Sequence, residues 1–389
     1  MTHRRRAAAV LAVAVAALAG CTSPGPRRGA HPATVTTVRG AGPAAITATT
    51  GPRVLVGALP EGCDQGLPAP NAVLTFVAGG RAWAVDPRDA TTLRCLFPTS
   101  DPGLWSWGPR GDRVLLDGLA VRGVGTGLSR PSGTFDPSYY SWSRPTGTTV
   151  VFTSQAQSDI RRADMGYNGS EDITPIPGAR YGDMAYHPSG LAIGFVAALP
   201  GGPQSLWMST NMGKDPQQLV SAGDTGTTFG HIVFAHDGVG LYYSVDVGNT
   251  AHTVARYDLA TGAVDAPLWS GDAPVQDMTE LAGVPGLALT VGAECTQRKA
   301  VFSALDGSAG QVLDPGVPGP VSVVGRIDAD RFVVAVGGCD GAPSDLYLVH
   351  RSSAAPTVIV RGATTAAMRT PEPTPAPPLP QHLPRSAVP

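Results

Sequence analysis

The sequence predicts an all-β fold, a β-propeller, from three observations. Short runs of β-branched, aromatic and apolar residues alternate with Gly, Pro, Asp and Asn turns between residues 54 and 362, and helical periodicity is scarce. One phrase of sequence recurs at intervals of about 40–45 residues, the usual length of a four-stranded propeller blade. A second, hairpin-like phrase lies between successive copies of the first.

The first phrase consists of an aromatic or apolar residue, a small residue, a glycine-containing turn and a β run. Clear copies begin at Trp107, Trp142, Tyr186 and Phe234, and weaker copies begin near Leu281 and Val324. The spacings between copies are 35, 44, 48, 47 and 43 residues. We expect each aromatic residue to fill the wedge between neighbouring blades and the glycine to permit a tight turn. The four clear aromatic residues are therefore predicted to be core residues.

The second phrase is a β run, a polar turn and another β run, with Asp, Asn, Gly and Thr in the turn. Copies lie near residues 82, 118, 160, 206, 254, 300 and 346, which favours seven blades. The opening phrase is found only six times, because the first unit lacks one, so six blades is the alternative. Residues 54–59 could supply the missing strand or could close the ring by joining the last blade.

Both phrases together resemble the repeats of TolB-type β-propellers, in which a Trp-Ser-Pro-Asp-Gly-like turn opens each blade. The resemblance covers residues 54–362 and is strongest from Trp142 to Trp269. No copy holds the full five-residue string, so the resemblance rests on pattern and period together. It implies a protein of the bacterial envelope with protein partners there, although an analogy of fold names no particular partner.

The first 21 residues predict export and a lipid anchor. Arg4–Arg6 are positive, Ala7–Ala17 are apolar but too few to span a bilayer, and Leu18–Gly20 precede Cys21. Leu-Ala-Gly-Cys resembles the lipobox of bacterial lipoproteins, in which the Cys thiol is acylated. We therefore expect the mature protein to be lipid-anchored at Cys21, on the extracytoplasmic face of the cell membrane. An ordinary secreted protein is the alternative, and the arginines leave twin-Arg export open beside the general route.

The rest of the chain divides into a tether, the propeller and a tail. Residues 22–53 are rich in Pro, Gly, Ala and Thr, which predicts a flexible tether. Residues 54–362 form the predicted propeller. Residues 363–389 contain the run PEPTPAPPLP and are expected to be a disordered, proline-rich tail. Such a tail is a solvated spacer in the simpler interpretation and a ligand for a partner in the other.

Four further cysteines suit disulfides in an oxidising compartment. Three pairings are possible, and closeness in sequence favours Cys63–Cys95 and Cys295–Cys339. The second pair is 44 residues apart, one blade period, so its bond would join adjacent blades at equivalent loops. The first would pin the start of the domain to the fourth strand of blade one. No close CxxC or His spacing indicates a metal site.

Few residues carry a chemical signature. The net charge of −2 is evenly spread and gives no basic surface for nucleic acid, and no Gly-x-Ser-x-Gly motif marks a nucleophile. His187 and His236 lie in the opening turns of consecutive blades, where Asp183 or Asp237 could join them in binding a polar ligand or a metal. Scattered turn and surface histidines are the simpler interpretation.

Aspartates also recur in turns, where their side chains are expected to bond backbone N–H groups without calcium. They are Asp172, Asp224, Asp237, Asp258, Asp306 and Asp328.

The leading hypothesis is a membrane-anchored, non-enzymatic propeller that binds a protein, glycan or other ligand of the cell envelope, with no predicted cofactor, metal or catalytic residue. The rival is a propeller enzyme or carbohydrate-binding protein with a site in the mouth of the central channel. Two or more carboxylates or histidines within about 5 Å of one another in the channel would favour the rival. A purely structural surface protein, the third hypothesis, predicts a channel poor in charge.

Overall fold

The computed structural model describes residues 53–63, 67–99, 104–116, 120–123, 129–131, 139–164, 169–248, 250–352, 355–369, 372 and 374–380. The expected signal peptide, its Cys21 and the tether up to residue 52 lie outside these residues. Within the described ranges, no helix has the length and apolar character needed to cross a membrane.

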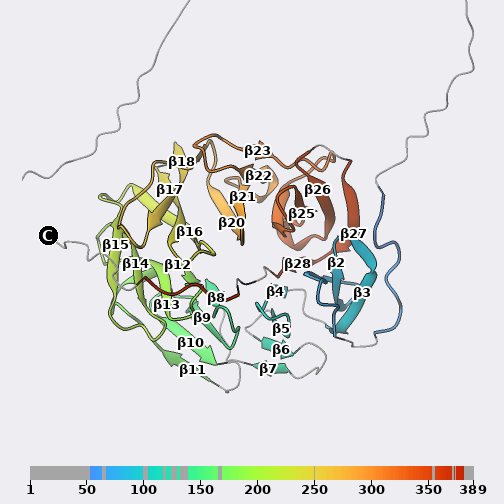
Figure 1. Cartoon of the computed structure of the whole chain (residues 1–389), viewed down its shortest axis with the longest axis horizontal. Helices are drawn as coiled ribbons and strands as arrows, with labels where there is room; N and C mark the ends of the chain where they lie inside the picture. Colours follow the sequence, from blue (N-terminus) through green and yellow to red (C-terminus); the bar gives the residue numbers. More distant parts are fainter. Residues whose placement is uncertain are drawn as a thin grey trace, which may run out of the picture. The chain divides into compact units, whose positions relative to one another are not determined.

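The described strands form seven four-stranded antiparallel sheets, arranged in a ring (Figure 1). Neighbouring sheets contact one another through their innermost strands, for example β12 (Arg180–Tyr186) with β16 (Thr227–Phe234) and β16 with β20 (Val275–Leu281). This arrangement confirms the predicted all-β propeller fold, since each sheet buries its faces only against its two neighbours.

Six sheets use four strands that follow one another in the chain from the innermost to the outermost. Their remaining strands are β4 (Leu104–Trp107), β5 (Arg113–Leu116), β6 (Ala120–Gly123), β7 (Ser129–Pro131), β8 (Tyr140–Trp142), β9 (Thr149–Thr153), β10 (Ile160–Asp164), β11 (Ser170–Asp172), β13 (Ala192–Ala198), β14 (Gln204–Thr210), β15 (Gln217–Ser221), β17 (Gly240–Val247), β18 (Ala251–Asp258), β19 (Trp269–Gly271), β21 (Val284–Val291), β22 (Lys299–Ser303), β23 (Gln311–Val312), β24 (Val321–Arg326), β25 (Arg331–Gly337), β26 (Ser344–His350) and β27 (Thr357–Ala363). Two short 3₁₀ turns complete the elements, η2 (Cys295–Gln297) and η3 (Cys339–Gly341).

The remaining sheet joins the two ends of the domain. It has the order β28 (Thr365–Met368), β1 (Leu74–Ala78), β2 (Arg81–Asp86) and β3 (Asp89–Pro98). β28 pairs antiparallel with β1 and supplies the innermost strand that the first unit lacks. The prediction that the tail begins at residue 363 is therefore wrong, because the sheet extends to Met368.

Residues 54–59 do not supply that missing strand. Val54 instead bridges in parallel to Val358 of β27, and the N–H groups of Leu55 and Val56 donate to β27 carbonyls. Of the two expected roles for this segment, joining the last sheet is confirmed. The start of the domain thus joins the last sheet, and its end, β28, joins the first sheet. The pairing of β28 with β1 closes the ring.

The four clear copies of the opening phrase occupy the same place in their sheets. Trp107, Trp142, Tyr186 and Phe234 end the innermost strands β4, β8, β12 and β16, and each is at most 7% exposed. Their prediction as core residues is confirmed. The Trp142 indole N–H also donates to Ser106 of the neighbouring sheet, at 2.5 Å, so the aromatic residue joins two sheets as well as filling the space between them.

The turn glycines are required because consecutive opening turns lie against one another. Gly190 has φ +74°, and a Cβ atom built on it would lie 2.2 Å from the carbonyl oxygen of Arg144 in the preceding turn. A side chain at this position would therefore both strain the backbone and clash with a neighbouring main chain.

Both predicted disulfides are present. Cys63–Cys95 links the start of the domain to the outermost strand β3, with Cα atoms 5.0 Å apart. Cys295–Cys339 links η2 and η3, the equivalent loops that follow β21 and β25, with Cα atoms 5.7 Å apart. The second bond therefore joins two adjacent sheets, as the one-period spacing predicts.

Candidate functional site

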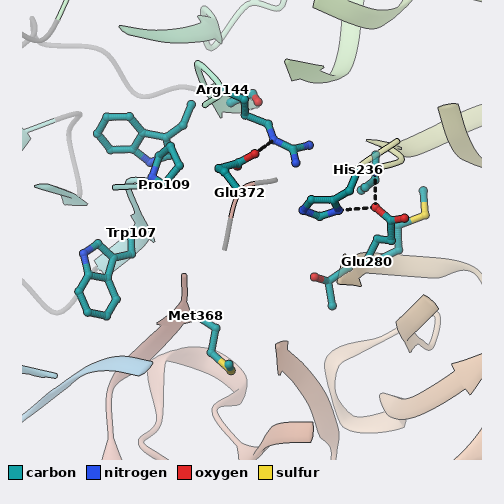
Figure 2. Close-up of a pocket in the computed structure, with 12 residues that line it drawn as sticks. Trp107, Pro109, Arg144, His236, Glu280, Met368 and Glu372 are labelled. Carbon is teal, nitrogen blue, oxygen red and sulfur yellow. Dashed lines mark hydrogen bonds and ion pairs between the residues drawn. The ribbon is translucent and has the colours of Figure 1, made fainter. Parts of the chain in front are cut away.

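A polar pocket lies at the end of the ring where the innermost strands reach their opening turns. It encloses about 220 Å³. Figure 2 shows the residues that define this mouth pocket: Trp107, Pro109, Arg144, His236, Glu280, Met368 and Glu372. They come from five sheets and from the C-terminal segment, so residues far apart in sequence build one site.

His236 and Glu280 form the first pair of this pocket. The Nδ1 atom of His236 lies 2.5 Å from Oε2 of Glu280, which also accepts the backbone N–H of His236 at 2.8 Å. His236 is 7% exposed, and its Nε2 atom has no hydrogen-bond partner among the described residues. A carboxylate at Nδ1 orients the ring and leaves Nε2 free to bond a ligand.

Arg144 and Glu372 form the second pair. The Nε atom of Arg144 lies 2.9 Å from both carboxylate oxygens of Glu372, and both side chains are largely buried. The Nη2 atom of Arg144 is buried and has no partner among the described residues. Figure 2 shows the end of the Arg144 side chain and the imidazole of His236 pointing toward one another across the pocket.

Nη2 of Arg144 and Nε2 of His236, which have no partner among the described residues, suit the mouth pocket to binding a polar ligand. A buried donor or acceptor left without a partner costs about 1–3 kcal/mol, so buried polar groups are normally paired with protein or water. Arg144 offers a permanent cation and His236 a group that can donate or accept. Trp107 and Met368 add an apolar wall, which is usual in small-molecule sites.

A second cluster lies deeper, on the walls of the channel. Asp183, His231 and Asp277 stand on the consecutive innermost strands β12, β16 and β20, next to β-bulges that interrupt the pairing of each strand. The carboxylate of Asp183 lies 3.8 Å from Nδ1 of His231 and accepts the N–H of Ile232 at 2.9 Å. Bulges redirect side chains, and here they accompany three titratable groups facing one interior space.

The channel cluster has shifted acid–base properties. Asp277 is accessible to water inside the channel, but protein surrounds it, and this burial raises the pKa of its carboxyl to about 6. His231 opposes the shift and the Asp183 charge adds to it. Burial likewise raises the pKa of Asp183. Asp277 and Arg298 also line a cavity of about 420 Å³ that continues toward the Cys339 end of the ring.

The four residues proposed from sequence do not form one site. His236 lines the mouth pocket, whereas Asp183 belongs to the channel cluster. His187 is fully buried between sheets, where Nε2 lies 2.8 Å from the carbonyl of Gly238, so it has the structural role of the simpler interpretation. Asp237 is exposed and accepts backbone N–H groups of its own turn.

The turn role predicted for the aspartates is confirmed. Each of the six accepts at least one backbone N–H group two or three residues further on, for example Asp224 from Gly226 and Thr227. Within the described ranges, no group of three or more His, Cys, Asp or Glu side chains is placed to hold a metal ion.

Sequence reasoning missed Arg144, Glu280 and Glu372. A signal for Arg144 exists in the repeat itself. The second residue after the opening aromatic is Pro109 or Pro188 in two copies, but it is Arg144 or His236 in the other two. Pro109 also lines the pocket, so the signal is the replacement of a turn proline by a side chain that can bond a ligand. Glu372 carries no such signal, since it lies outside the repeats.

Comparison with known proteins establishes the fold. No model of a protein family matches the chain, and no curated protein matches it. A prolyl endopeptidase structure aligns with 76% of this chain at 14% identity and a TM-score of 0.51; this chain spans 50% of its length. An oligogalacturonate lyase in complex with manganese aligns with 69% of this chain, 82% of its own length, at 13% identity and a TM-score of 0.50.

TolB from Acinetobacter baumannii is also among the similar structures. It aligns with 76% of this chain and 81% of its own length, at 14% identity and a TM-score of 0.47. Likeness at these identities concerns the β-propeller fold alone.

Proposed function

We propose that this protein is a β-propeller of the bacterial envelope, anchored by lipid at Cys21, that binds a small polar ligand in the mouth of its channel. Each of the seven sheets is one blade in this proposal. Its protein or glycan partners in the envelope would meet the rigid ring at that mouth. The repeat pattern, the fold and the position of the polar residues support the proposal.

The observation that carries it is a pair of buried nitrogens, Nη2 of Arg144 and Nε2 of His236, that have no hydrogen-bond partner within the described ranges. A ligand that bonds both would remove two unsatisfied groups at once. A charge-poor channel, expected of a purely structural protein, does not match these residues. His236 and Glu280 also lie within about 5 Å of one another at the channel mouth, and this arrangement equally favours the rival hypothesis of a propeller enzyme or carbohydrate-binding protein.

A ligand screen with a matched control tests this proposal. The secreted part of the chain is unfolded thermally with sugars, sugar acids, amino acids and dicarboxylates. A ligand at about 100 times its Kd stabilises a protein by about 2.7 kcal/mol, which raises Tm by several degrees. We expect at least one compound to raise Tm of the wild type and to lose its effect in His236→Gln.

The control is His252→Gln, because His252 pairs with Asp246 at 2.6 Å in a similar way but does not line the mouth pocket. The proposal would be contradicted if every active compound raised the Tm of His236→Gln and His252→Gln equally, or if no compound raised the Tm of the wild type.

The lipid anchor needs its own test. Cells that express the full precursor are grown with an alkyne-bearing fatty acid, and the purified protein is checked for the label. We expect label on the wild type and none on Cys21→Ser, because the thiol is the acylated group. Unlabelled wild-type protein in the culture medium would favour the ordinary secreted alternative.

A propeller enzyme or carbohydrate-binding protein is the second candidate, and the channel cluster favours it. Paired carboxylates beside a histidine can supply a general acid and a general base, and perturbed pKa values gather at functional sites. Hydrolysis or elimination assays on oligosaccharides test it. Activity lost in Asp277→Asn would support an enzyme, and no turnover by the wild type would remove this candidate.

A further inference from the structure

The described residues that follow β28 lead away from it toward the sheet of β8 and the outer strands beyond (Figure 1). The chain leaves β28 at Met368, which lines the pocket. Arg369 then donates to the carbonyls of Pro70 and Arg110. Glu372 pairs with Arg144 on the sheet of β8, so Met368 and Glu372 both line the pocket.

The C-terminal segment is also held beyond Glu372. A Cβ atom built on Gly238, in the turn after β16, would lie 3.0 Å from Cβ of Pro377, so the two backbones lie close together. Leu379 packs against the hydrophobic cluster that contains Phe234 and Leu241. Pro377 and Leu379 are half-buried, whereas β28 is fixed by its pairing with β1. Local opening beyond Arg369 therefore breaks the Arg144–Glu372 pair and these partly buried contacts but leaves β28 in its sheet.

Glu372 satisfies Arg144 incompletely. Both of its oxygens approach the single Nε atom, at 2.9 Å each, and Nη2 has no partner in the part of the chain that the structure describes. A guanidinium binds a carboxylate best when two parallel N–H bonds meet the two oxygens. A free carboxylate could take that forked position on Nε and Nη2 and would then also stand beside Nε2 of His236. The site thus fits an incoming carboxylate better than the one already attached to the chain.

We propose that Glu372 is a tethered substitute for a carboxylate group of the natural ligand, a small carboxylic acid, and that binding displaces Glu372 together with the described residues 374–380. The cavity of about 220 Å³ limits the ligand to a small molecule. This inference rests on the proposed function, because it names the ligand class of the same pocket. The C-terminal segment then competes with the ligand for the mouth pocket, so removing the Glu372 carboxylate should raise the affinity of the protein for the ligand.

Tryptic cleavage of the full secreted chain reports whether the segment is docked. Cleavage after Arg369 requires its side chain to leave Pro70 and Arg110, while cleavage after Arg385 serves as an internal reference. We expect cleavage at Arg369 to be about tenfold faster in Glu372→Gln than in the wild type, because a charge-assisted bond is lost. Glu171→Gln, a Glu paired with an arginine at the surface, is the matched control and should cleave as the wild type does.

Four probes test the ligand class: succinate and D-glucuronate, with their neutral counterparts succinamide and D-glucose. We expect a carboxylate probe to bind Glu372→Gln about tenfold more tightly than the wild type and to speed cleavage at Arg369 of the wild type. The neutral probes should do neither.

Two results would overturn the inference. Equal cleavage and equal affinity in the wild type and Glu372→Gln would show that Glu372 is no competitor. Binding of the neutral probes alone, or of no carboxylate to Glu372→Gln, would reject the carboxylic acid. The proposed function would survive either result if another ligand depends on His236, so the two failures are distinguishable.

Discussion

His236 and Glu280 belong to neighbouring sheets, and their side chains meet with Nδ1 and Oε2 2.5 Å apart. The same carboxylate oxygen accepts the His236 backbone N–H. One side chain therefore fixes both the turn that carries His236 and the direction of its imidazole. The pocket is built at a contact that also holds the ring together.

Replacing Glu280 by Ala should lower the free energy of unfolding by about 1–3 kcal/mol, because two buried donors on His236 lose their acceptor. Glu280→Gln keeps one acceptor oxygen and should cost less. Urea denaturation measures both, with Glu171→Ala at the surface as the control. Equal stability of Glu280→Ala and the wild type would show that the contact contributes nothing.

Gly190→Ala should destabilise the protein more than Gly201→Ala does. Both glycines have a φ near +73°, so alanine strains either backbone by about 1–2 kcal/mol. Only at Gly190 would the new Cβ meet the Arg144 carbonyl, at 2.2 Å, while Gly201 faces open space. Thermal unfolding measures the stability of both variants, and the difference between them reports the clash at Gly190. Equal losses of stability would contradict the close contact between the two opening turns.

Removing the Cys295–Cys339 disulfide by a double substitution to Ser should cost about 2–4 kcal/mol. The bond closes a loop of 44 residues in the unfolded chain and joins two adjacent sheets in the folded one. Guanidinium denaturation without reductant measures the loss. If the wild type and the double variant unfold at the same midpoint, the bond does not constrain the ring.

Asp277 should make stability depend on pH between about pH 4 and pH 6. Its pKa is raised to about 6 from 3.8, so the folded state holds the proton more tightly than the unfolded state does. The resulting stability is complete below the unfolded pKa and is lost as pH rises through the folded pKa. We expect the wild type to lose stability relative to Asp277→Asn over this interval in urea denaturation.

Asp306→Asn is the control of opposite sign. Hydrogen bonds from Ser308 lower the pKa of Asp306, so its contribution is lost as pH falls. A wild type and Asp277→Asn that respond identically to pH would contradict the raised pKa.

Features set by local sequence were predictable. The opening turns recur with the repeat period, and Cys295 and Cys339 lie one period apart, because each unit solves the same packing problem with nearby residues. The aspartates bond backbone groups of their own turns, so their role is also set locally. β28 was not predictable from its neighbours, since its partner β1 lies at the other end of the domain and only ring closure selects it.

The residues of the site were harder to predict from the sequence than the fold. His236 was found from its place in an opening turn, but its partner Glu280 comes from the next sheet. Composition indicated a disordered tail around Glu372, although a single ion pair with Arg144 and a few apolar contacts place it at the pocket. Contacts between distant segments leave no local pattern in the chain.

Calorimetric titration of Arg144→Gln tests the central claim, a ligand site at the channel mouth, most directly. Arg361→Gln is the matched control, because Arg361 also pairs with a carboxylate, at 2.8 Å from Asp345, but stands exposed outside the pocket. The account predicts that the ligand found by screening binds Arg144→Gln at least about tenfold more weakly than the wild type, and Arg361→Gln equally well. Equal affinity for Arg144→Gln and the wild type would contradict it.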